Sequence, residues 1–353
     1  MLRRFLELPP YRPIEPPEEI ARRLKIPPQE IVKLDGNENP YGCSPRVKKA
    51  LKNLKNIHIY PDPLHRRLKK ALSEYTGMEE EYIIAGAGSD EILELITRLF
   101  IEEGDKVAIF TPTFGMYPFL AKLYGGKLIE VGRKEDFSID PNSLKEKVKL
   151  IFIASPNNPT GNTISGKELL PLLEKAEFIV IDEAYYEFSG ETFINLIPKI
   201  KKLGVVRSFS KWAGIASLRV GYGIFPKDIT ETLYKIKQPY NVNLAGEVAA
   251  IASLEDRELL MKRVRMIIRE RERAYKKLGE LGLKPYPSKA NFILCETKRA
   301  REIKEELLKR GILIRYFEGR GLEDKIRVSI GTVSYTHLRA HETRHDLVCR
   351  LLL

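Results

Sequence analysis

Lys211 lies among residues that together suit one kind of ligand. Ser208 and Ser210 precede it, and Arg219 follows eight positions further on. The lysine amine can bond to an aldehyde, while hydroxyls and a guanidinium can hold a phosphate. Pyridoxal phosphate carries both groups, so these residues predict a site for it. The alternative is that Lys211 is an ordinary surface lysine in a polar loop. The chain has 60 lysines and arginines, and most residues of these types are exposed.

A glycine-containing segment, residues 86–91, offers a second place for a phosphate. It stands between an expected strand and an expected helix, so the backbone amides of Gly88 and Ser89 would point at an anion at the helix N-terminus. A dinucleotide-binding turn is the weaker interpretation, because Glu91 stands where that motif has its third glycine.

Two polar side chains follow or end other expected strands. Asn158 lies within residues 155–161, which could also be a simple Asn-Pro turn. Asp182 ends an apolar run, where a carboxylate needs a partner such as a protonated pyridine nitrogen. The alternative for Asp182 is a cap on the following turn.

Two aromatic residues could complete the same site. Phe114 follows a third expected strand, so its ring could cover the face of a planar ligand or belong to the core. Tyr60 offers a phenol directly before a rigid Pro-Asp-Pro turn.

The pattern between these motifs predicts an α/β protein. Short apolar runs alternate with helical patterns, such as residues 90–102, 117–124 and 166–175, which is typical of a mostly parallel sheet covered on both faces. Lys211 would then follow a strand at the edge where ligands bind in such folds. The seven expected strands are residues 82–85, 106–111, 127–131, 150–154, 178–182, 203–206 and 220–225.

We expect four parts along the chain. Residues 1–34 are punctuated by prolines and form an arm that packs with the small domain, 35–240 form the large cofactor-binding domain, and 241–332 form a smaller α+β domain. After residue 243 a long helical stretch, about 246–281, leads to strands at 291–295, 312–315 and 326–329.

Residues 333–353 form the fourth part. His341 and His345 are one helical turn apart with Glu342 between them, which matches a short zinc-protease pattern. The surrounding string resembles translated cloning DNA, so we expect a non-native tail and no metal site.

The composition is that of a soluble globular chain, with 43% hydrophobic and 31% charged residues. Its apolar runs are too short to span a membrane. Three cysteines, odd in number and far apart, predict a reducing, cytoplasmic setting without disulfides. The net charge of +12 suggests nucleic acid as a partner. Because acidic and basic residues alternate along the helical stretches, we expect neither nucleic acid nor membrane partners.

Taken together and in chain order, these motifs resemble the class I and II pyridoxal-phosphate aminotransferases, which have the fold-type-I architecture, over roughly residues 9–332. Within that family, Tyr11 on the arm and the segment 34–42, which contains Asn37, resemble the histidinol-phosphate aminotransferase group. Residues 60–63 and 115–117 point the same way.

The resemblance implies a role for each residue. Lys211 would carry the cofactor covalently and then move a proton between the substrate and cofactor carbons. Asp182 would keep the pyridine nitrogen protonated. Asn158 and Tyr185 would hydrogen-bond the phenolate oxygen of the ring, and Phe114 would stack on its face. The residues implied to hold the phosphate are Gly88, Ser89, Ser208, Ser210 and Arg219, with Tyr60 of the partner subunit in a homodimer. The residues implied to bind substrate are Tyr11, Asn37, Arg315 and Arg327.

The resemblance also implies the reaction. It is an exchange between histidinol phosphate, a phosphorylated amino alcohol, and 2-oxoglutarate that gives imidazole acetol phosphate and glutamate, a step in histidine biosynthesis. Three alternatives stay open: a broad aromatic or aspartate aminotransferase, an enzyme like threonine-phosphate decarboxylase, and a regulatory or nucleic-acid-binding protein that keeps the fold.

Overall fold

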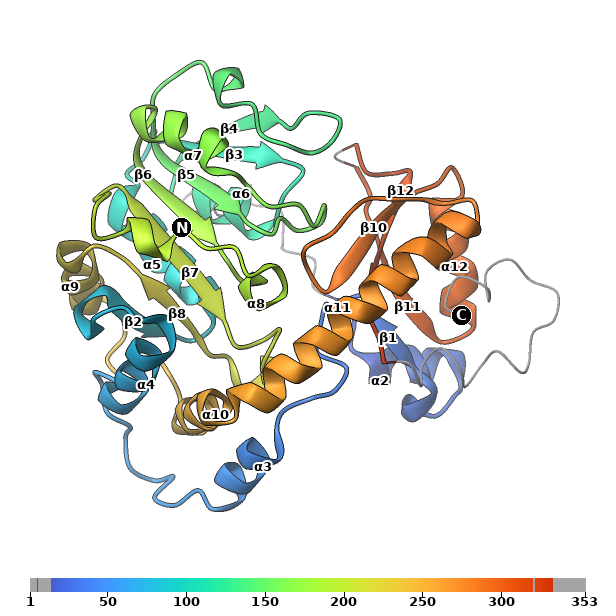
Figure 1. Ribbon diagram of the computed structural model, residues 1–353, viewed down its shortest axis with the longest axis horizontal. Helices are drawn as coiled ribbons and strands as arrows, with labels where there is room; N and C mark the ends of the chain where they lie inside the picture. The colour runs from blue at the N-terminus through green and yellow to red at the C-terminus, as the bar shows by residue number, and fades with distance from the viewer. Residues whose placement is uncertain (1–4, 6–13, 320, 333–353) are drawn as a thin grey trace.

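The computed structural model describes residue 5 and residues 14–319 and 321–332. Its larger sheet has seven strands in the order β2-β8-β7-β6-β5-β3-β4 (Figure 1). Neighbours from β7 to β4 are parallel, and β8 is antiparallel to both β2 and β7. The predicted α/β class with a mostly parallel seven-stranded sheet is therefore confirmed. The strands are β2 (Ile83–Gly86), β3 (Lys106–Thr111), β4 (Lys127–Gly132), β5 (Val148–Ala154), β6 (Ala176–Asp182), β7 (Leu203–Ser208) and β8 (Gly221–Ile224).

Helices cover both faces of this sheet because its strands are apolar on both sides. Along β5, Leu150 and Phe152 belong to one buried cluster, while Ile151 and Ile153 belong to the other. One face packs against α5 (Ser89–Phe100), α6 (Met116–Leu123) and α9 (Lys227–Ile236). The other face packs against α4 (Arg66–Thr76), α8 (Tyr186–Ser189), α10 (Leu244–Glu255) and α11 (Arg257–Glu280), with α3 (Pro45–Lys52) beside them. The motif residues are left at the strand ends, between the two layers of helices.

The smaller sheet has the strand order β1-β11-β12-β10-β9. Its first strand, β1, comes from the predicted arm, where we expected no strand, and pairs in parallel with β11. The other neighbours are antiparallel. In Figure 1, β1 and α2 (Pro17–Leu24) lie beside β11 and α12 (Ala300–Lys309). The domain boundaries themselves stay predictions. The strands are β1 (Val32–Leu34), β9 (Lys284–Pro285), β10 (Phe292–Glu296), β11 (Ile312–Tyr316) and β12 (Lys325–Ser329).

Two predicted helices are interrupted. The long helical stretch expected over residues 246–281 is present but divided into α10 and α11, because the chain leaves helical geometry at Asp256, with φ −107° and ψ 23°. This break lets α10 stay beneath the larger sheet while α11 runs on to the smaller one (Figure 1). The helix expected over residues 166–175 ends as α7 (Gly166–Leu169), and a 3₁₀ turn, Leu170–Glu174, follows. Pro171 lies in that turn and has no N–H to continue an α-helical ladder.

Candidate active site

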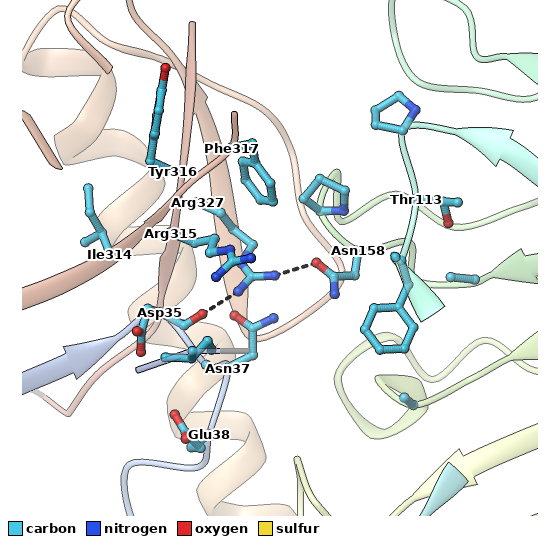
Figure 2. Close-up of a pocket in the computed structure, with 18 of the residues that line it drawn as sticks. Asp35, Asn37, Glu38, Thr113, Asn158, Ile314, Arg315, Tyr316, Phe317 and Arg327 are labelled. Carbon is cyan, nitrogen blue, oxygen red and sulfur yellow. Dashed lines mark hydrogen bonds between the residues drawn. The ribbon is translucent and has the colours of Figure 1, made fainter. Parts of the chain in front are cut away.

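A cavity of about 1060 Å³ lies at the carboxyl edge of the larger sheet, facing the smaller sheet (Figure 2). It brings together residues that are far apart in the sequence. Among those predicted for the site, the lining includes Asn37, Ser89, Phe114, Asn158, Asp182, Tyr185, Ser208, Ser210, Lys211, Arg219, Arg315 and Arg327. Tyr11 and the predicted tail, 333–353, lie outside the described residues.

Lys211 stands three residues past the end of β7, as the sequence predicted. Its Nζ donates to the carbonyl oxygen of Gly36 at 3.1 Å and lies 5.9 Å from the centre of the Tyr185 ring. Burial, together with the charge of Arg327, lowers the pKa of Lys211 to about 8. A lysine with a lowered pKa is more often the neutral amine that attacks an aldehyde.

The turn before α5 fits a phosphate. Gly88 has φ +84°, and a Cβ at this position would lie 2.5 Å from Nη2 of Arg219, so the arginine can approach only a glycine. Arg219 donates to Asp90 Oδ2 at 2.8 Å and to Ser210 Oγ at 3.5 Å. Ser208 Oγ accepts from the Ser210 amide at 3.1 Å. Hydroxyls, a guanidinium and the start of a helix thus face one corner of the cavity.

Asp182 is 5% exposed, and the donors that reach its carboxylate within the described residues are uncharged. Its Oδ1 accepts from the Ala184 amide at 3.0 Å, and its Oδ2 accepts from the hydroxyl of Tyr117 at 2.7 Å. Burial raises the pKa of Asp182 to about 6 although both hydrogen bonds lower it. The hydrogen bond from the Ala184 amide means that Asp182 also caps the turn after β6, which was the alternative role for this residue. A buried carboxylate at a cavity wall, with neutral donors around it, fits the protonated nitrogen of a pyridine ring.

Contacts from the segment that follows β1 and from the smaller sheet close the other side of the cavity. The side-chain Nδ2 of Asn37 donates to the hydroxyl of Tyr185 at 2.9 Å. The backbone N–H of Asn37 donates to Ser329 Oγ at 2.9 Å. Arg327 donates to the side-chain oxygen of Asn158 and to the backbone carbonyl of Asp35 (Figure 2). These bonds connect the segment after β1, the larger sheet and the smaller sheet at the residues predicted to contact cofactor and substrate.

Arg315 and Arg327 form the cationic wall of the cavity. They are directly opposite in the register of β11 and β12, so their side chains leave the sheet on the same face. Figure 2 shows both guanidinium groups extending from the smaller sheet toward Asn158. Each lies 6.0 Å from the centre of the Phe317 ring. Two neighbouring cations can bind an anion with more than one negative charge.

Phe114 and Tyr60, the two aromatic residues predicted for the cofactor, lie in different places within a single chain. The role of Tyr60 in the site of a partner subunit stays a prediction. Phe114 lines the cavity and meets the Tyr117 ring edge-on, with 5.6 Å between ring centres. Tyr60 is 76% exposed and stacks on Tyr240, with 4.4 Å between ring centres, and it is not among the described residues that line the cavity.

Sequence reasoning missed the hydrogen bond between Tyr117 and Asp182. Tyr117 was noted only as part of the segment 115–117, with no role of its own. It is fully buried on α6, 65 positions before Asp182. Its place shortly after a strand end, two positions beyond Gly115, is the available sequence signal that it could face the site.

Metal binding and membrane spanning have no candidate in the part of the chain that the structure describes. Within residues 14–319 and 321–332, no group of three or more His, Cys, Asp or Glu side chains is arranged to hold a metal ion. None of the helices described there has the length and apolarity to cross a membrane.

Comparisons with known proteins agree on one family. The sequence profile described as aminotransferase class I and II matches residues 29–339. The histidinol-phosphate aminotransferase of Roseiflexus castenholzii is 48% identical over 340 residues, with 92% of each chain covered. Histidinol-phosphate aminotransferase 1 of Arabidopsis thaliana, a chloroplastic protein, is 46% identical over 340 residues, with 94% of this chain and 82% of that protein covered.

A solved structure gives the same relationship in three dimensions. The histidinol-phosphate aminotransferase from Sinorhizobium meliloti, in complex with pyridoxal-5'-phosphate, matches with a TM-score of 0.86. The two chains are 26% identical, and the match covers 100% of this chain and 95% of that one.

Proposed function

Since the chain belongs to the class I and II aminotransferase family, we propose that it transfers the amino group of histidinol phosphate to 2-oxoglutarate with pyridoxal phosphate as cofactor. This reaction is the histidine-biosynthesis step that the sequence predicted. The observation that most strongly supports this proposal is the cavity in which Lys211, Asp182 and the turn at Ser89 meet. Relatives named histidinol-phosphate aminotransferase, at 46–48% identity, support the choice of substrate.

Each of the chain's residues then has a defined task. When bound, pyridoxal phosphate supplies an aldehyde for the amine and a ring that accepts electrons from the substrate carbon. Lys211 holds the aldehyde and later moves a proton to and from the substrate carbon, which its lowered pKa of about 8 favours. Asp182 holds a proton on the ring nitrogen, and Ser208, Ser210 and Arg219 fix the phosphate.

The two arginines of the smaller sheet support a phosphorylated amine. Glutamate presents a carboxylate beside its amine, whereas histidinol phosphate presents a methylene phosphate there, so one anion site must accept both groups. Arg327, tied to Asn158 and Asp35, would grip the carboxylate. Arg315, opposite it in the sheet, would add a second cation for the larger phosphate.

The test begins with the covalent bond. Borohydride reduction of the yellow protein should fix the cofactor to the peptide that contains Lys211. A label recovered on another lysine would contradict the assignment. The half-reaction should then be followed by absorbance with histidinol phosphate, unphosphorylated histidinol, aspartate, phenylalanine and threonine phosphate. Release of carbon dioxide from threonine phosphate would favour the decarboxylase alternative.

A pair of variants separates the anion sites. Arg315→Ala should lower the use of histidinol phosphate about ten- to a hundredfold, since a hydrogen bond to a charged group contributes roughly 1.5–3 kcal/mol. Glutamate should be affected much less. Arg299→Ala, an arginine on the surface that pairs with Glu302, is the matched control. Equal losses for both substrates, or equal use of histidinol and its phosphate, would favour a broader aminotransferase.

We also propose a homodimer with shared sites and a cytoplasmic location. The dimer is supported by a group of exposed apolar side chains near Tyr60, namely Ile57, Ile59, Leu64 and Tyr240. Burying such side chains against a second copy would stabilise the pair. The location is supported by two free thiols, at Cys43 and Cys295.

The shared site can be tested by complementation. Lys211→Ala subunits and Tyr60→Phe subunits should each have low activity alone. Mixed and refolded together, they should regain activity, because some heterodimers then hold one complete site. A protein that is monomeric and fully active at low concentration would contradict the dimer.

A further inference from the structure

Tyr117 stands directly behind the carboxylate that faces the cavity. Its side chain is fully buried on α6, and its hydroxyl donates to Asp182 Oδ2 at 2.7 Å. The ring is stacked on Phe152, with 5.2 Å between centres and 9° between planes, and Phe114 meets it edge-on. These rings hold the phenol in place, so its hydroxyl stays directed at Asp182.

The direction of this hydrogen bond is fixed by the two groups. Burial, and then the charge of Asp182, raise the pKa of Tyr117 well above its ordinary value, so the phenol keeps its hydrogen and donates it. A hydrogen bond of this kind stabilises the ionised carboxylate relative to the protonated one. Within the part of the chain that the structure describes, the Ala184 backbone amide is the other donor to Asp182.

We propose that Tyr117 is a positioning residue that keeps a proton on the ring nitrogen of the bound cofactor by making the Asp182 carboxylate less basic. The proposal rests on the proposed function, because it requires pyridoxal phosphate in the cavity. A proton between the nitrogen and the carboxylate can lie on either atom. Removing the Tyr117 hydroxyl leaves the buried carboxylate with a greater affinity for that proton.

The expected change is large enough to measure. A hydrogen bond to a charged group is worth roughly a ten- to a hundredfold change in an equilibrium. In Tyr117→Phe, the ratio of ring-protonated to carboxyl-protonated forms should therefore fall by about this factor. The phenylalanine keeps the contacts with Phe152 and Phe114, so packing should be preserved.

The experiment uses the holoenzyme with cofactor labelled with nitrogen-15 in the ring. The nitrogen chemical shift of the wild type should lie near the protonated limit, and that of Tyr117→Phe should move toward the unprotonated limit. Tyr124→Phe is the matched control, because Tyr124 also donates to a carboxylate, Glu94 Oε1 at 2.9 Å, but away from the cavity. Its spectrum should equal that of the wild type.

A second measurement separates this role from a purely structural one. The analogue whose ring nitrogen is replaced by C–H cannot share a proton with Asp182, so wild type and Tyr117→Phe should bind it equally within about twofold. An unchanged nitrogen shift in Tyr117→Phe would overturn the proposal, and so would a loss of analogue affinity of more than about fivefold. If wild-type protein bound no cofactor at Lys211, the proposed function itself would fail, which is a different result.

Discussion

Asp182 and Glu183 are adjacent in the chain, both are buried carboxylates, and they lie on opposite faces of the larger sheet. Asp182, at the end of β6, faces α6 and the cavity and accepts from a phenol and an amide. Glu183 faces the other side, where Arg207 donates two hydrogen bonds to Oε2 at 2.8 and 3.0 Å. Thr192 and the Phe193 amide also donate to Glu183.

The difference shows how one strand end can serve both structure and binding. Burial raises the pKa of both carboxyl groups, but Arg207, only 2% exposed, supplies a cation from within the chain to Glu183. The hydrogen-bond partners of Asp182, Tyr117 and the Ala184 amide, carry no charge, and the charges of Asp90 and Glu183 raise its pKa further. A buried carboxylate paired by its own chain makes the fold depend on that partner, whereas one that faces a cavity with neutral donors is available to a cationic ligand.

The largest effect is expected on the structural side. Arg207→Met keeps the aliphatic stem but leaves Glu183 buried without its cation, so the free energy of unfolding should fall by about 3–5 kcal/mol. Urea unfolding of the apoprotein measures it. The double variant Arg207→Met with Glu183→Gln should recover most of this loss. A double variant as unstable as the single one would show that packing of Arg207, 3.5 Å above the Tyr186 ring, matters more than charge.

On the binding side, neutralising the buried carboxylate itself should raise the free energy of unfolding. The pKa of Asp182 is about 6 in the folded chain against 3.8 ordinarily, so its ionisation destabilises the folded apoprotein as pH rises from about 4 through 6. Asp182→Asn should stabilise the apoprotein by about 1–3 kcal/mol at pH 7.5, and not at pH 4.

The same Asp182→Asn variant should lose function while it gains stability. Its turnover should fall about ten- to a hundredfold, because the ring nitrogen of the bound cofactor loses a charged partner. Thermal unfolding of the apoprotein at two pH values and a transamination assay check both halves. A variant less stable than wild type at pH 7.5 would remove the distinction between the two carboxylates.

Sequence reasoning could find Asp182 but not its surroundings. A carboxylate after an apolar run is a local signal, and so are the lysine after β7 and the glycine before α5. The partner of Asp182 is 65 positions away, and Asn37 is 148 positions from the tyrosine it contacts. Local periodicity carries no information about such pairs, since they depend on which strand ends meet at the edge of the sheet.

The errors in the fold have related causes. The strand β1 has three residues and stands in a proline-rich arm, so it is stable only through its pairing with β11. The break at Asp256 falls within a stretch without proline, at the point where α10, which packs on α3 and α4, gives way to α11, which contacts β9 and β10. Nothing in the segment 182–183 indicates which of two adjacent carboxylates will meet Arg207.

A third carboxylate, Glu187, should give a moderate, pH-dependent effect. It is 5% exposed, Tyr75 donates to its Oε1 at 3.1 Å, and its Oε2 has no hydrogen-bond partner within the described residues. Burial raises its pKa to about 7 from 4.5, so stability present below pH 4.5 is lost as pH rises through 7.

Glu187→Gln removes this ionisation. The variant should be about 1–2 kcal/mol more stable than wild type at pH 8 and no more stable at pH 5, because the new amide hydrogens offset part of the gain. Melting temperatures measured across this pH range check the prediction. An identical pH dependence in both proteins would show that another group causes it.

The smallest effect is expected at the opposite end of β6. Glu177 pairs with Lys149 at 3.0 Å, but the two side chains are 62% and 33% exposed. Water screens an exposed pair and already solvates each charge, so Glu177→Gln should change the free energy of unfolding by less than about 0.5 kcal/mol, and added salt should reduce even that. Urea unfolding at low and high salt measures it. The exposed carboxylate at the start of β6 would then contribute little to the free energy of unfolding. At its end, neutralising Asp182 would stabilise the apoprotein, whereas removing the cation beside Glu183 would destabilise it. A loss above about 1 kcal/mol in Glu177→Gln would mean that pairing, rather than burial, decides what a carboxylate contributes here.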